Sequence, residues 1–150
     1  MPSIKHVFVL MLENRSFDHM LGVNPFTGID AVTQKPTQIN ALPPGASNSW
    51  NGKNCPAGLP AVDPIKNDPY HEFEDVLEQL CGAGVTYPKG GPYPPINNSG
   101  FVSNFAVAAK SPSPGDVMKG FTPERLPVLS ALARAYAVCD SWFCSLPGPT

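Results

Sequence analysis

A run of apolar residues leads directly into polar and charged side chains near the start of the sequence. Val7 to Leu12 are all apolar, and Glu13, Asn14 and Arg15 follow without a break. Buried charges must be paired or bound to a metal, and hard divalent cations prefer carboxylate and amide oxygens. The pattern predicts that Glu13 and Asn14 bind a divalent metal cation, whose identity the pattern leaves open. The alternative is local: Glu13 pairs with Arg15, and Asn14 caps the next helix.

A histidine stands at the start of a predicted helix in the middle of the chain. His71 follows the letters NDPY, and the N-terminus of a helix attracts anions. We therefore expect His71 to contact a phosphate group. The alternative is a partly exposed histidine in the turn before the helix. His19 is expected to have a structural role, packing beside the turn formed by Glu13 and Asn14.

Thr150 follows the letters SLPGP. A hydroxyl group at the tip of a strand-to-helix turn can act as a nucleophile when a metal lowers its pKa. Thr150 is therefore a candidate nucleophile and a candidate metal-binding residue. The alternative is an ordinary loop threonine.

The spacing of apolar residues predicts the elements that position these side chains. The continuous apolar run at 6–12 predicts a strand buried on both faces, and 137–145 reads as a second strand. Helical spacing and capping residues predict four helices, at 16–21, 68–82, 100–110 and 122–136, with Asp68 and Thr122 at the start of the second and the fourth. Helices between buried strands favour an α/β fold with a parallel sheet. Sites in such sheets lie beyond the carboxyl ends of strands, which is the position of Glu13 and Asn14.

Two long segments show neither a helical nor a strand period. Residues 24–68 and 83–99 are rich in Pro and Gly, which account for 19 and 13 of the 150 residues. We expect surface excursions that cover the site and shape its pocket. The aromatic faces of Trp50, Tyr87 and Tyr93 could contact a quaternary ammonium group. The alternative is that these three residues anchor the loops.

Length, charge and hydropathy exclude several classes of protein. A chain of 150 residues is enough for one domain with one core. Its net charge is −2 and it has no basic stripe, which argues against nucleic-acid binding. No apolar run reaches the roughly 18 residues of a transmembrane helix. Glu13 and Arg15 interrupt any signal-peptide core, which favours a cytoplasmic or peripheral membrane location; secretion is the alternative if the natural start lies upstream.

The four cysteines do not form a CxxC pair, which argues against a zinc site made of thiolates. Cys139 and Cys144 flank an apolar segment and are expected to pack as small hydrophobic residues. A disulfide between Cys55 and Cys81 would require an oxidising compartment.

Four motifs occur in order along the chain: MLENRSFDHMLG, DPYHEFEDV, MKGFTPERLPVLSALARAYAVCDSWF and SLPGPT. Together they resemble the phosphoesterase family that includes non-haemolytic-type phospholipase C and a group of acid phosphatases, over residues 4–150. That family belongs to the alkaline phosphatase superfamily, so the resemblance implies a large parallel sheet between helices. It also implies that Glu13 and Asn14 bind the metal, that Thr150 is the nucleophile, and that His71 lies near the phosphate.

The resemblance further implies that residues 1–150 are the N-terminal part of a single catalytic domain, ending at the nucleophile position. Later acidic metal ligands and phosphate-binding histidines of the family have no counterpart in this sequence. The implied activity is that of a metal-dependent phospholipase C. It would cleave glycerophospholipids to diacylglycerol and a phosphorylated head group through a phospho-threonine intermediate.

Three alternatives to this activity remain. One is an acid phosphatase that acts on phosphomonoesters, and another is an inactive fragment that binds phosphate or a partner. The third is a structural calcium site in a non-enzymatic secreted domain, which would leave Thr150 without a role. The expected partners are phospholipid or phosphate ester substrates, with peripheral contact to a membrane.

Overall fold

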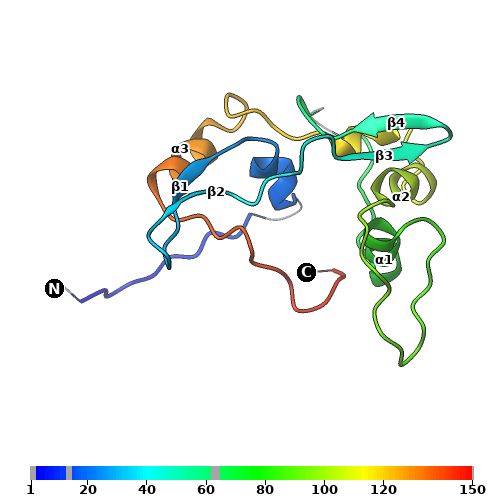
Figure 1. Cartoon of the computed structure of the whole chain (residues 1–150), viewed down its shortest axis with the longest axis horizontal. Coiled ribbons are helices and arrows are strands. Elements are labelled where there is room, and N and C mark those ends of the chain that lie inside the picture. The colour runs from blue at the N-terminus through cyan, green and yellow to red at the C-terminus, as the bar shows by residue number, and fades with distance from the viewer. Residues whose placement is uncertain (1–2, 13–14, 62–64, 150) are drawn as a thin grey trace.

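The computed structural model describes residues 3–12, 15–61 and 65–149 and combines helices with small antiparallel sheets (Figure 1). In chain order the elements are η1 (Asp18–Gly22), β1 (Thr27–Ile29), β2 (Pro36–Gln38), β3 (Ser47–Trp50), β4 (Lys53–Pro56), α1 (Phe73–Cys81), α2 (Phe101–Val107), η2 (Pro114–Met118) and α3 (Pro127–Ala135). Figure 1 shows α3 and the β1–β2 hairpin towards one end of the molecule, and α1, α2 and the β3–β4 hairpin towards the other. This mixture is compatible with part of an α/β fold.

The segment 24–68, expected to be an irregular excursion, contains two hairpins. β1 pairs with β2, and β3 pairs with β4, both antiparallel. The β3–β4 turn consists of Asn51 and Gly52, with φ of 48° and 74°. Asn-Gly is a preferred pair for a tight hairpin turn in which both residues have positive φ. The expectation of an irregular segment was therefore wrong. The Asn-Gly turn favours a hairpin even though polar and apolar residues alternate only weakly in the flanking strands.

The expected helix at 68–82 is present but shorter. α1 begins at Phe73, with Glu72 as its N-cap, and ends at Cys81, with Gly82 as its C-cap; the φ of 109° at Gly82 suits glycine. The predicted cap at Asp68 was wrong. The backbone carbonyl of Tyr70 accepts a hydrogen bond from the Gln79 side chain at 2.7 Å, so the residues before α1 make a tertiary contact in place of a first helical turn.

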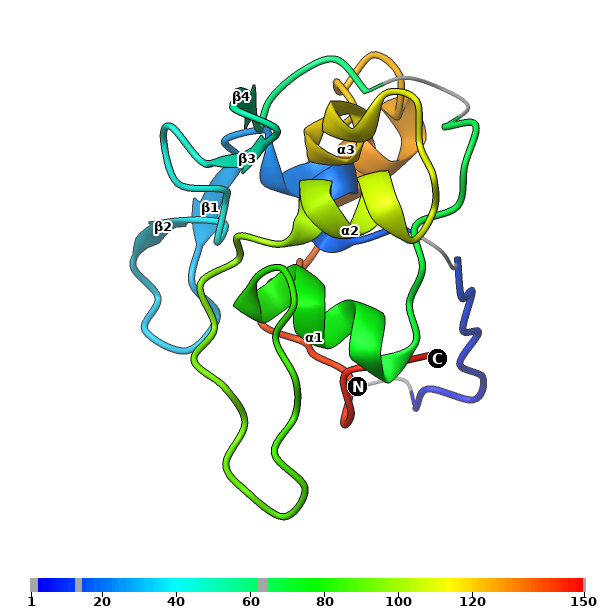
Figure 2. The ribbon, with the colours of Figure 1, turned by 90° about the vertical axis from the view of Figure 1, so that its right-hand side faces the viewer.

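The buried core gathers around α2, which contacts α1, β3 and η2. Val102, Phe105 and Leu77 are almost completely buried. Figure 2 shows α1 and α2 lying on each other, with the loop after α1 extending away from both. Gly100 permits this close approach, because a Cβ atom there would collide with the backbone carbonyl of Glu78.

The last helix begins later than expected. Backbone amides of Arg125 and Leu126 donate to the Thr122 carbonyl, closing one turn. α3 then begins at Pro127, where a residue without an N–H fits the first helical position. The start predicted at Thr122 was therefore wrong by five residues. The expected apolar stripe is only partly covered, since Leu132 and Tyr136 are exposed.

The two predicted strands at 6–12 and 137–145 are not strands in this structure. Phe8 is 94% exposed and Trp142 is 84% exposed. A parallel strand needs hydrogen-bonded neighbours at its edges, and neither segment pairs with another strand. The parallel-sheet core is consequently not confirmed. Within the described ranges, the one parallel pairing is an isolated bridge between Gly58 and Lys119.

None of the helices in the described part of the chain is long and apolar enough to cross a membrane.

Candidate functional site

A cavity of about 520 Å³ lies between η1, the segment before α1 and the end of η2. The chemistry-bearing side chains on its wall are Arg15, Asp18, His19, Asp68, His71 and Lys119. Two permanent cations, two imidazoles and two carboxylates thus share one space. Ligand pockets typically combine such a volume with a few convergent polar groups, so this cavity is the candidate functional site.

His71 reaches the cavity wall from the short segment that precedes α1. It lies two residues before the helix and is exposed. Asn67 Nδ2 donates to the Ala109 carbonyl at 2.7 Å, and Gln79 Nε2 donates to the Tyr70 carbonyl at 2.7 Å. These two contacts hold both sides of the segment against α1 and the end of α2. Whether His71 contacts phosphate stays a prediction.

η1 presents His19 and Asp18 to the cavity. The Ser16 hydroxyl oxygen accepts the His19 backbone N–H at 3.1 Å, as expected for a serine at this helix start, and the helix ends at Gly22. The His19 ring stacks on Phe121 with centroids 5.1 Å apart. His19 therefore packs against Phe121 and also lines the cavity. Its expected place beside Glu13 and Asn14 lies outside the described residues.

Burial and local charge determine the protonation of these two groups. Burial, followed by the positive charge of Arg15, lowers the pKa of His19 below its usual 6.5. The His19 Nε2 atom is buried and has no hydrogen-bond partner among the described residues. Partial burial raises the pKa of Asp18 above 3.8. Burial and the charge of Arg15 therefore both favour the uncharged form of the His19 imidazole.

Three of the predicted site residues, Glu13, Asn14 and Thr150, lie outside the described residues. Their neighbours in sequence are described: Arg15, which follows Asn14, and Gly148, two residues before Thr150. Both line the same cavity as His71. Three motifs that are far apart in the sequence therefore reach one cavity.

The cavity wall also contains groups that the sequence pattern did not single out, chiefly Lys119 and Gln79. Lys119 Nζ donates to the Pro56 carbonyl at 2.7 Å, which ties η2 to the β3–β4 hairpin. Arg15 was considered only as a partner for Glu13. Its position in the first motif, directly after Glu13 and Asn14, was the sequence signal that could have indicated a place at the site.

The predicted metal ligands suit a hard divalent cation by chemistry, since carboxylate, amide and hydroxyl oxygens are its preferred donors. Asp18 and Asp68 add two carboxylates to the cavity wall. Across 3–12, 15–61 and 65–149, however, no group of three or more His, Cys, Asp or Glu side chains could hold a metal. A metal site would thus depend on the motif residues Glu13 and Asn14.

The three aromatic loop residues are not on the cavity wall. Phe73 contacts Tyr87 and Tyr93 edge-on, with centroids 5.5 Å and 6.5 Å away. The Tyr87 hydroxyl donates to the Gly91 carbonyl at 3.1 Å. Trp50 forms the end of β3, paired with Lys53. The two tyrosines therefore anchor the loop after α1, in line with the alternative expectation.

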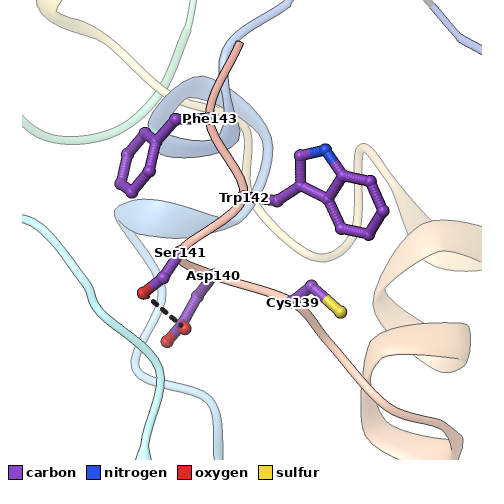
Figure 3. A pocket seen from close by; sticks show the side chains of 5 residues that line it. All are labelled: Cys139, Asp140, Ser141, Trp142 and Phe143. Carbon is purple, nitrogen blue, oxygen red and sulfur yellow. Dashed lines mark hydrogen bonds between the residues drawn. The ribbon is translucent and has the colours of Figure 1, made fainter. Parts of the chain in front are cut away.

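A second hollow, of about 550 Å³, follows the segment from Cys139 to Phe143 (Figure 3). Asp140 accepts hydrogen bonds from the Asn40 backbone amide at 2.6 Å and from the Ser141 hydroxyl at 3.4 Å. Trp142 and Phe143 point to opposite sides of the backbone. Five consecutive residues line this hollow and no predicted site residue does, so it is a surface feature of an extended segment.

The cysteines differ from expectation. Cys139 and Cys144 are exposed rather than packed, because the segment that carries them is not covered. Cys55 and Cys81 are both free thiols in this structure.

Known proteins resemble this chain along its whole length. The profile of the Phosphoesterase family matches residues 4–150. The chain is 40% identical to non-specific phospholipase C3 of Arabidopsis thaliana, over 98% of the chain and 27% of that relative. It is 39% identical to non-specific phospholipase C5 of the same plant, over 98% of the chain and 28% of the relative. Phospholipase C B of Mycobacterium tuberculosis is 32% identical, over 100% of the chain and 28% of the relative. The chain therefore spans little more than a quarter of the length of these curated relatives.

Proposed function

The chain belongs to the Phosphoesterase family, and on this premise we propose that it contributes the nucleophile half of the active site in a metal-dependent phospholipase C. The substrate class is glycerophospholipid, and the products are diacylglycerol and a phosphorylated head group. Relatives that carry the name phospholipase C, in both a plant and a bacterium, support the choice of substrate.

One observation carries the proposal: Arg15, His71 and Gly148 line a single cavity. Arg15 directly follows the Glu-Asn pair, His71 belongs to the DPYH segment, and Gly148 precedes Thr150 by two residues. A phosphoryl-transfer site needs a nucleophile, cationic or hydrogen-bonding groups and a metal around one phosphate. We assign these roles to motif residues that line this cavity or whose neighbours in sequence line it.

The residues of the chain would act on the substrate in two steps. Lys119 and Arg15 attract the phosphodiester, and His71 donates a hydrogen bond to a non-bridging oxygen. The Thr150 oxygen attacks phosphorus, a new P–O bond forms, and the bond to the diacylglycerol oxygen breaks with proton transfer to that oxygen. Water then hydrolyses the phospho-threonine, which releases the phosphorylated head group and restores the hydroxyl.

A divalent cation held by Glu13 and Asn14 would supply charge neutralisation and would favour the alkoxide form of Thr150. Charge on the non-bridging oxygens is the main feature that phosphoryl transfer must stabilise. His71 and the two cations of the cavity would serve that purpose from the protein side.

The test uses the full-length gene product with two substrates, phosphatidylcholine and an aryl phosphate, each with and without a chelator. Phosphocholine release that a chelator abolishes supports the proposal. Thr150→Ala should then remove turnover, and His71→Ala should reduce it by about a hundredfold. His6→Ala, on the exposed segment 3–12, is the matched histidine control and should leave turnover unchanged.

Different outcomes would redirect the assignment. Release from the aryl phosphate alone would identify a phosphomonoesterase. Undiminished turnover of Thr150→Ala would overturn the nucleophile. No turnover on either substrate in the presence of divalent metal would contradict an enzymatic role and favour a phosphate-binding module.

A further inference from the structure

A chain of side-chain amides connects the buried core to the segment that carries His71. Asn104 on α2 is 1% exposed. Its Oδ1 accepts a hydrogen bond from Gln79 Nε2 of α1 at 2.9 Å, and the same Nε2 donates to the Tyr70 carbonyl at 2.7 Å. Tyr70 is the residue directly before His71. Two amide side chains therefore join α2, α1 and the wall of the cavity.

The orientation of the Asn104 amide is determined by its other neighbours. Its Nδ2 donates to Asp75 at 3.0 Å and to Glu78 at 3.2 Å. Ionised carboxylates only accept hydrogen bonds, so the NH₂ group must face them and the oxygen must face Gln79. The amide of Asn104 cannot flip without placing its oxygen against two carboxylates.

The orientation of Gln79 follows from that of Asn104. A side-chain NH₂ group has two N–H donors, and Gln79 uses one on the Asn104 oxygen and one on the Tyr70 carbonyl. The backbone of Gln79 is held as well, because its carbonyl accepts the Gly100 amide at 3.1 Å. Every donor of this amide pair has an acceptor; the bonds of the Asn104 side chain are partly buried, and the bond to Tyr70 lies at the surface. Satisfied side-chain networks rigidify the elements that they join.

We propose that Gln79 and Asn104 are positioning residues for His71, fixing the Tyr70–His71 backbone so that the imidazole stays on the cavity wall. His71 itself is exposed and lies before the first turn of α1. The amide chain restrains the backbone at Tyr70, directly before it. This inference rests on the proposed function of the cavity.

The decisive substitution is Gln79→Met, which keeps the length of the side chain and removes both donors. Gln79→Glu is the second variant, because its carboxylate would face two acceptor oxygens, those of Tyr70 and Asn104. The matched control is Gln34→Met. Gln34 Nε2 also donates to a backbone carbonyl, that of Ala31 at 2.9 Å, but on an exposed hairpin turn.

The measurement is kcat and KM for phosphatidylcholine with the full-length gene product, in the parent and in a His71→Ala background. In the parent, Gln79→Met should lower kcat about ten- to a hundredfold, as expected for a displaced catalytic group. KM should change little. The melting temperature should fall somewhat, because the buried Asn104 oxygen loses its donor, so kcat is measured well below it. In the His71→Ala background, Gln79→Met should cause no further loss. An equal loss in both backgrounds would overturn the proposal, because Gln79 would then act without His71.

A second measurement separates failure of this inference from failure of the proposed function. Nitrogen-15 relaxation of the histidine side chains reports the mobility of the His71 imidazole whether or not the protein is active. Gln79→Met should increase that mobility, and Gln34→Met should not. If the protein hydrolyses neither substrate, the proposed function fails while the mobility result still supports or overturns the positioning role. Unchanged mobility in Gln79→Met overturns it.

Discussion

The unit formed by α1, α2, η2 and the β3–β4 hairpin differs sharply from the two segments 3–12 and 137–149. Both regions are rich in apolar residues. Phe105 in the first is 1% exposed, whereas Phe8 in the second is 94% exposed. The unit around α2 buries its apolar side chains between elements that contact one another, and neither of the two segments pairs with a strand of the described residues.

The contrast shows how the pattern of apolar residues determines the partners an element needs. An amphipathic helix such as α1 has one apolar side, and a single neighbouring helix covers it. A run that is apolar on every side, such as Val7 to Leu12, must be covered on both faces and hydrogen-bonded at both edges. The neighbouring helix that α1 requires is α2, which lies within about 30 residues of it in sequence. The described residues do not supply the covering faces and paired strands that Val7 to Leu12 would require.

The largest expected difference between the two regions comes from a matched pair of phenylalanines. Phe105→Ala should lower the free energy of unfolding by about 3–5 kcal/mol, because it leaves a cavity in the core. Phe8→Ala should change it by less than about 0.5 kcal/mol, since its side chain is already in solvent. Urea denaturation followed by circular dichroism measures both. A comparable loss for Phe8→Ala would show that segment 3–12 is packed in solution and would remove the contrast.

A glycine pair tests the close approach of α1 and α2. Gly100→Ala should destabilise the protein by about 1–3 kcal/mol, because the new methyl group meets a backbone oxygen that cannot move aside. Gly28→Ala on the exposed β1 strand should be neutral or slightly stabilising, since no atom lies within 4 Å of the added Cβ. Thermal melts of the two variants give the comparison. Equal melting temperatures would mean that the helices separate without cost.

An asparagine pair on the β3–β4 hairpin tests the polar contacts of the packed unit. Asn48 is 4% exposed, donates to the Asn98 carbonyl at 2.9 Å and accepts the Val102 amide at 3.2 Å. Asn48→Ala should lower the free energy of unfolding by about 1–2 kcal/mol, because both groups lose their partner. Asn54→Ala, on the exposed side of the facing strand, should be neutral. Hydrogen exchange of the Val102 amide should accelerate in the first variant only.

The smallest effect is a pH dependence that distinguishes two histidines. The pKa of His19 in the folded protein is lower than 6.5, so the unfolded chain binds the proton more strongly. The His19 contribution to stability is therefore complete above pH 6.5 and declines as pH falls from 6.5 towards the lowered value. Urea midpoints at pH 7.5 and 5.5 should differ less in His19→Gln than in the parent.

The control for this prediction is a histidine on the exposed segment 3–12. His6 is exposed on segment 3–12, and His6→Gln should preserve the pH dependence of the parent. If His6→Gln reduced the pH dependence as much as His19→Gln does, the assignment to the buried imidazole would be contradicted.

Much of the local structure could be predicted from the sequence. The helices over α1 and α2 follow from apolar spacing, and the stop of α1 follows from Gly82. The start of α2 was predicted at Gly100 and α2 begins at Phe101. The start of α1 was wrong, because the Tyr70 carbonyl bonds to the Gln79 side chain and the helix begins only at Phe73. The β3–β4 hairpin was missed although Asn51 and Gly52 indicate it. The predicted strands were wrong because strand formation depends on partners that a single apolar run does not specify.

The candidate site, too, could be predicted only in part from the sequence. Residue types made Glu13, Asn14, His71 and Thr150 candidates, since oxygen donors, an imidazole and a hydroxyl are the groups that phosphate ester chemistry requires, and the resemblance of the four motifs to the family selected them. The roles of these four residues stay predictions. No local pattern indicated that Lys119 and His19 share a cavity with His71, because these residues are separated by up to 100 positions in sequence.

Motifs, periodicity and capping act over a few residues, so the family, the local helices and the kinds of chemical group available could be read from the sequence. The common cavity of Arg15, His71 and Gly148, and the hydrogen bonds from Asn104 through Gln79 to the Tyr70 carbonyl, became known only from the three-dimensional arrangement. Those contacts join residues that are distant along the chain. They form only when the core around Phe105 brings α1 and α2 together, and composition or spacing cannot specify such a meeting in advance.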